Sequence, residues 1–202
     1  MKHVILFLLF FNSVYLFAYI APQTIYTEER FFITTGELDF HQTMDEVSIT
    51  LLKYNNYSKW ALNGMQGINK ESEGLIAYFT DINFSLEESL FLVTFDLNLV
   101  WPFGKKGIVM KFKPFQEYYD NGDLKSITLI PLIESDHVEA VEMEFILLKN
   151  KNIDGVSMTY TSRIRLSKFL DFFFSLRSYK RNFEWYIFKM ADNFSSYLNS
   201  QY

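Results

Sequence analysis

The sequence predicts a single α+β domain in which a curved antiparallel sheet of about six to seven strands wraps around a long C-terminal helix. One stretch before residue 41 and several after residue 73 alternate apolar and polar side chains, as strands with one solvated face do. A short amphipathic stretch lies between them, and the last stretch repeats apolar side chains at helical spacing. The expected order is therefore strand, helix, several strands and a long helix.

The first 21 residues have the pattern of a secretory signal. Lys2 and His3 give a basic start, and residues 4–20 are almost entirely apolar. We expect residues 1–21 to be a signal segment and residues 22–202 to be the domain, exported to a periplasmic or extracellular location. No clean small-x-small cleavage motif closes the segment, so its retention as a membrane anchor is an open alternative.

Composition limits the partners. The chain has no cysteine, so an exported domain must be held by its core rather than by disulfides. The net charge of −5 comes without a basic block or stripe, which argues against nucleic acid as a partner. The 22 phenylalanines and 13 tyrosines predict a large core or a cavity lined with rings, although a biased coding composition would also enrich these residues.

A strand and a helix are the first elements of the expected domain. Residues 30–40 place phenylalanine and leucine on one parity and acidic residues on the other, which predicts a strand. Thr43 and Glu46 have the spacing of a capping box, so we expect a helix to begin there and to end near Lys53. An aromatic turn up to residue 60 would then fold the chain back.

Six further strands are expected after this turn. The clearest is residues 90–100, in which Phe91, Val93 and Phe95 share one face. An Asn-Gly pair within residues 120–123 predicts a hairpin turn. The other expected strands cover residues 74–82, 107–115, 124–133, 138–149 and 154–166.

The final element is expected to be one helix over residues 167–199. This stretch contains no proline or glycine, and a helix of roughly thirty residues would span about 45 Å, enough to cross a sheet. If the sheet wraps this helix, Phe172, Phe173, Leu176 and Phe183 should be buried.

Two local patterns resemble the START-like superfamily of helix-grip domains, also called SRPBCC or Bet v 1-like domains. TMDEVSITLLKYNNYSKW at residues 43–60 looks like that superfamily's passage from a strand into a helix and a turn with Tyr and Trp. WPF at residues 101–103, followed by GIVM at residues 107–110, looks like its proline-centred loop before a central strand. Residues 105–106 are both lysine, where START domains usually have an acidic and arginine-containing pair.

The resemblance covers residues 30–199 and implies a helix-grip fold. It also implies a cavity between the long helix and the sheet, which in this superfamily usually holds a lipid or another apolar ligand. Relatives with this architecture include enzymes of the cyclase or hydratase kind.

Eight aromatic residues are the candidate walls of such a cavity. Rings supply apolar area, and the hydroxyl of Tyr160 or Tyr186 could orient a ligand. Plain core packing is the alternative, because a filled core and a hollow one need the same periodicity. The candidates are Trp60, Phe91, Phe95, Trp101, Phe112, Tyr160, Phe173 and Tyr186.

No residue is expected to be catalytic, and no metal or cofactor is expected. His41 and His137 are the only histidines after the signal segment, and they lie about a hundred residues apart without ligand spacing. Glu142 and Glu144 share a strand face, which in a half-buried sheet is normally the outward one.

The leading functional hypothesis is an exported, non-enzymatic protein that holds a lipid or other apolar small molecule between sheet and helix. One alternative is a structural or partner-binding envelope protein whose cavity has closed, and another is an enzyme of the cyclase or hydratase type. Peripheral or anchored association with a membrane is a further expectation. The sequence specifies neither the ligand nor the oligomeric state.

Overall fold

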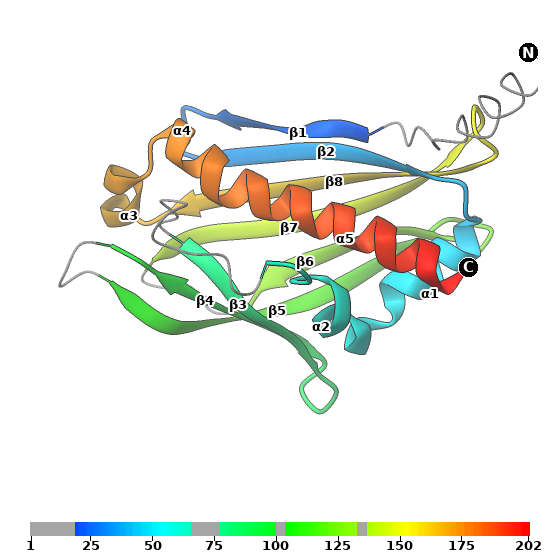
Figure 1. Ribbon diagram of the computed structural model, residues 1–202, viewed down its shortest axis with the longest axis horizontal. Helices are drawn as coiled ribbons and strands as arrows, with labels where there is room; N and C mark the ends of the chain where they lie inside the picture. The colour runs from blue at the N-terminus through cyan, green and yellow to red at the C-terminus, as the bar shows by residue number, and fades with distance from the viewer. Residues whose placement is uncertain (1–18, 66–76, 100–103, 133–136) are drawn as a thin grey trace, which may run out of the picture.

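The structure is a computed structural model that describes residues 19–65, 77–99, 104–132 and 137–202. These residues form an eight-stranded antiparallel sheet that curls around one long helix (Figure 1), so the predicted α+β class is confirmed. The strand order is β1-β2-β8-β7-β6-β5-β4-β3. The strands are β1 (Tyr19–Tyr26), β2 (Phe32–Phe40), β3 (Ala77–Ser85), β4 (Leu90–Leu97), β5 (Lys105–Tyr118), β6 (Leu124–Pro131), β7 (Val138–Asn150) and β8 (Gly155–Leu166).

The predicted count of six to seven strands is wrong, because β1 adds an eighth. It pairs with β2 and places Tyr26 opposite Phe32. It begins at Tyr19, inside the stretch assigned to the signal segment, so its apolar residues merge with those that precede it in sequence. Residues 1–18 lie outside the described residues, and the signal segment and its cleavage stay predictions.

The capping box and the aromatic turn are confirmed. Helix α1 (Met44–Leu52) begins where the Thr43 side chain accepts from the Glu46 backbone N–H and the Glu46 carboxylate accepts from the Thr43 N–H. After a 3-10 turn (Tyr54–Asn56), the short helix α2 (Tyr57–Trp60) returns the chain to α1. The Tyr57 hydroxyl donates to the Leu51 carbonyl at 3.0 Å, which fixes this return.

The prediction of one unbroken C-terminal helix is wrong. Helix α3 (Lys168–Phe173) ends at Phe174, whose backbone is extended, and Ser175 then caps the start of a second helix. That second helix runs without a break through α4 (Leu176–Tyr179), a π-helical turn (Lys180–Glu184, here the π-turn) and α5 (Trp185–Gln201). No helix of the described residues is long and apolar enough to cross a membrane.

The break changes which apolar residues of the C-terminal region are buried. Phe172 is 85% exposed and Leu176 39%, so the prediction that both are buried is wrong, while Phe173 and Phe183 are half-buried. Leu170 and Phe174 take the buried positions instead, because the extended residue rotates α3 relative to the long helix.

Helix α5 lies across the concave face of the sheet (Figure 1) and contributes buried side chains to the hydrophobic core. Phe194 contacts Phe40 of β2 edge to face at 5.6 Å between ring centroids, and Trp60 of α2 at 5.2 Å. Leu198 is fully buried one turn further along. The helix therefore joins the first half of the sheet to the helical segment that follows β2.

The π-turn is hydrogen-bonded to both edge strands of the sheet. On one side the Thr24 hydroxyl of β1 donates to Glu184 Oε2 at 2.5 Å. On the other side the Ala77 backbone N–H of β3 donates to Asn182 Oδ1 at 3.2 Å, and Asn182 is fully buried. A π-helical turn widens the helix locally, which is consistent with one turn reaching both strands.

Phe194→Ala should lower the free energy of unfolding by about 3–5 kcal/mol, because it removes a buried ring at the centre of the core. Phe172→Ala is the matched control from the same C-terminal region, and its exposed ring should change stability by less than about 0.5 kcal/mol. Urea unfolding followed by circular dichroism measures both. Equal losses in the two variants would contradict the packing described here.

Candidate ligand cavity

A cavity of about 140 Å³ lies between the concave face of the sheet and the long helix. Strands β3 to β8 supply most of its wall, and α5 closes it through Ile187, Met190, Ala191 and Phe194. The lining is almost wholly apolar. A curved sheet and a straight helix cannot touch along their full length, which accounts for space between them.

Five of the eight predicted wall residues line this cavity. They are Trp60, Phe91, Phe95, Phe112 and Tyr160. Trp101 lies outside the described residues. Whether any of these residues binds a ligand stays a prediction, since the structure contains none.

Phe173 and Tyr186 lie away from the cavity lining. Phe173 is half-buried and contacts Phe172 within α3, at 5.4 Å between centroids. Tyr186 is buried and packs edge to face on Phe79, at 5.0 Å. Burial raises the pKa of Tyr186 to about 12, so its hydroxyl stays protonated at neutral pH.

Four methionines in the wall were not among the predicted candidates. Met110, Met143 and Met158 come from three strands, and Met190 comes from α5. The alternation along the strands predicts that the three strand methionines face inward, but the predicted wall consisted of aromatic residues alone. Methionine is unbranched and flexible, so this wall can change shape at low cost.

Strand β8 supplies most of the hydroxyl-bearing residues of the lining. Tyr160, Thr161 and Ser162 all border the cavity. The Tyr160 ring lies against Gly36, its cross-strand partner in β2, where a Cβ atom would overlap the ring and its hydroxyl. Gly36 therefore sets the position of this ring, as glycine does where an aromatic side chain crosses the backbone.

A row of buried hydroxyl groups continues from Ser162 across the sheet. Ser162 pairs with Thr34 and Thr34 with Thr24, and the two threonine hydroxyls are 2.8 Å apart. Tyr179 covers the row and stacks on Phe32 at 4.1 Å between centroids. Burial raises the pKa of Tyr179 well above its usual value, and the Thr34 and Ser162 hydroxyls lower it in part.

The part of the lining that the structure describes is poor in groups for acid–base chemistry at neutral pH. Among the described residues that border the cavity, none is Asp, Glu, His, Lys or Arg. Burial raises the pKa of Tyr57, the tyrosine at the α2 end, far above its usual value. Glu142 and Glu144 alternate along β7 with cavity-lining residues and so lie on the outer face, as predicted. No three potential metal ligands come together in the described residues.

Solved structures with the same architecture identify the fold. A START superfamily protein from Mycobacterium smegmatis superposes with a TM-score of 0.54 at 8% sequence identity, covering 84% of this chain and 99% of that chain. The chain has the START-like helix-grip fold. The Zhui aromatase/cyclase from Streptomyces sp. R1128 superposes with a TM-score of 0.52 at 7% identity, covering 85% of this chain and 96% of that chain.

The resemblance expected from residues 43–60 is thus confirmed as a helix-grip fold. No family model and no curated protein matches the sequence. Identities this low establish the fold alone.

Gly36→Ala should push the Tyr160 ring toward the cavity and destabilise the protein by about 1–3 kcal/mol, as overpacking does. The same change in a Tyr160→Leu background should cost less, because the clashing ring is gone. A double-mutant cycle from urea unfolding gives the coupling. Additive losses would show that Gly36 and Tyr160 do not constrain each other.

Tyr57→Phe should change how stability depends on alkaline pH. Near neutral pH the wild type should be more stable by about 1 kcal/mol, because the variant loses the hydrogen bond to Leu51. Since folding raises the pKa of Tyr57, its contribution is full below about pH 10 and is lost as pH rises further. The wild-type advantage should shrink by about 1.4 kcal/mol per pH unit above that point.

Urea unfolding of both proteins at several pH values between about 8 and 11 makes this measurement. Tyr202→Phe, at an exposed position, controls for the number of tyrosines. A difference between wild type and Tyr57→Phe that stays constant across this range would contradict the burial of the Tyr57 hydroxyl.

Proposed function

We propose that this protein is an exported, non-enzymatic binding protein that holds an apolar ligand, such as part of a lipid, in the cavity between sheet and helix. The observation that carries the proposal is the chemistry of the wall, which is apolar except for the hydroxyl-bearing residues of β8 and Tyr57 and Trp60 of α2. Such a wall favours desolvated hydrocarbon and offers at most a few hydrogen bonds.

The volume sets the scale of the ligand. A cavity of about 140 Å³ is close to the roughly 150 Å³ of an engineered cavity that binds benzene. It is well below the roughly 300–1,000 Å³ of pockets for drug-sized ligands. The buried part of the ligand is therefore one ring or a short acyl end, and a longer chain needs the methionine wall to move.

Ser162 gives the ligand a preferred orientation. Its hydroxyl is buried, Ser162 borders the cavity, and the same hydroxyl lowers the pKa of the neighbouring Tyr179. A hydroxyl can donate one hydrogen bond and accept others, so a ligand hydroxyl or carbonyl placed there would gain affinity. A ligand with one polar group and an apolar body suits this lining, because the polar group can lie at Ser162 and the apolar body against the rest of the wall.

The small volume also supports a second candidate function. The space would then be a gap in a nearly closed core, and the protein would act through its outer surface as an envelope structural or partner-binding protein. A cyclase or hydratase role has less support, because the described lining offers no carboxylate or imidazole. Export rests on residues 1–21 and is part of the proposal.

Thermal unfolding of delipidated protein with benzene or 1-octanol tests ligand binding. A ligand at about 100 times its Kd should stabilise the wild type by about 2.7 kcal/mol. Ala191→Met fills the cavity from α5 and should abolish this stabilisation, whereas Ser196→Met, exposed on the same helix, should retain it. No shift in the wild type with either probe, and no apolar molecule in an organic extract of the purified protein, would favour the closed-core alternative.

A further inference from the structure

Residues 168–181, here called the α3–α4 corner, lie at one end of the molecule (Figure 1). They include large apolar side chains that are exposed. Phe172 is almost fully exposed, Phe169 is 45% exposed, and Leu176 follows them in sequence with more than a third of its surface exposed. Single exposed apolar residues are ordinary, but Phe169 and Phe172 both contact the Phe173 ring, at 5.2 and 5.4 Å between centroids, and so form a patch. Such patches mark a surface that contacts something other than water.

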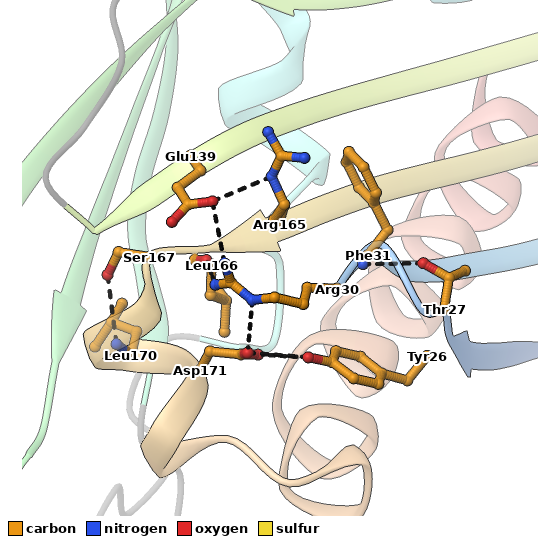
Figure 2. Close-up of polar contacts among 10 residues, drawn as sticks. All are labelled: Tyr26, Thr27, Arg30, Phe31, Glu139, Arg165, Leu166, Ser167, Leu170 and Asp171. Carbon is orange, nitrogen blue, oxygen red and sulfur yellow. Dashed lines mark hydrogen bonds and ion pairs between the residues drawn. The ribbon is translucent and has the colours of Figure 1, made fainter.

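A network of polar contacts holds helix α3 in place (Figure 2). The Asp171 carboxylate accepts from Arg30 Nε at 3.1 Å and from the Tyr26 hydroxyl at 2.9 Å. Arg30 also donates to the Leu166 carbonyl at 2.9 Å and pairs with Glu139 at 3.5 Å. Because α3 is tied to three strands, its exposed rings are presented on a fixed helix.

The same corner is basic in an acidic protein. Lys168, Arg177, Lys180 and Arg181 are exposed, and the one acidic residue of the segment is Asp171, which the Arg30 network engages. The whole chain has a net charge of −5, so these cations form a local exception. Cations beside exposed aromatic rings are typical of a protein segment that binds at a membrane surface.

An open groove of about 520 Å³ adjoins the corner along the long helix. Three cations, Arg177, Lys180 and Arg181, line it together with Trp185, Phe188 and one acidic residue, Glu184, which accepts a hydrogen bond from Thr24. Tryptophan is enriched at the level of lipid headgroups, and arginine and lysine contact their phosphates. Ala21 and Pro22 form part of the rim, and they are the last residue of the segment predicted to be a signal or anchor and the first residue after it.

We propose that the α3–α4 corner docks the protein onto the surface of a bilayer that contains anionic phospholipids. Phe172 and Phe169 enter the boundary between headgroups and acyl chains, and the cations of the groove contact the phosphates. If the N-terminal segment stays in the bilayer, it reaches the domain beside this groove. The docking does not depend on what the cavity holds.

A single fluorescent label tests this docking site. The chain has no cysteine, so Phe172→Cys can be labelled uniquely in the full-length protein with an environment-sensitive dye such as NBD. Leu86→Cys, at an exposed apolar position in the β3–β4 turn, is the matched control. Emission at position 172 should rise severalfold with vesicles of phosphatidylcholine and phosphatidylglycerol and stay low with phosphatidylcholine alone. The control should change little with either.

Charge variants test the electrostatic part. Arg177→Gln and Lys180→Gln should each weaken binding to the anionic vesicles about fivefold, whereas Lys53→Gln with Lys59→Gln, exposed near α2, should not. Equal responses of the two labels, no response at position 172, or insensitivity to these charges would overturn the proposal. A rise at position 172 with protein concentration and no vesicles would assign the patch to contact between copies.

Discussion

Burial of the concave sheet face under one helix is the constraint on which the rest of this structure depends. The concave face of the sheet is mostly apolar, and α5 covers much of it with Phe194, Leu198 and their neighbours. Because the sheet curves more than a helix can follow, contact is close where α5 meets β2 and α2 and incomplete toward the middle. The cavity is thus a geometric result of how this fold buries its core.

Local sequence patterns predicted most of the helices and strands. They did not predict an element boundary where one apolar stretch runs directly into another. Alternation located seven strands, and Thr43 with Glu46 located the first helix. The eighth strand was missed because its apolar residues continue those of the N-terminal segment. The break at Phe174 was missed because Phe172 and Phe173 precede it and Leu176 follows it, with no glycine or proline between them. The local sign of the break is Ser175, which caps the next helix.

The sequence predicted which face of the sheet carries the candidate site. It did not predict which residues along that face border the cavity. Parity along a strand tells which side chains point inward, and this placed residues such as Phe91 and Phe112 correctly. Distance from the cavity depends on where the helix crosses each strand, which is a long-range property. Tyr186 illustrates the difference. It is buried and packs on Phe79, which lines the cavity, but Tyr186 itself does not border the cavity.

The π-turn has a consequence for the order in which the protein folds. It joins β1 to the C-terminal helix through residues 160 positions apart, and β3 to the same turn through residues 105 positions apart. Such contacts have a high loop-closure cost and form late. The Thr24 hydroxyl and the Ala77 backbone N–H therefore lack these partners until residues 182–184 have been synthesised. Until then the edge strands β1 and β3 are without the π-turn beside them and are more open to pairing with other chains.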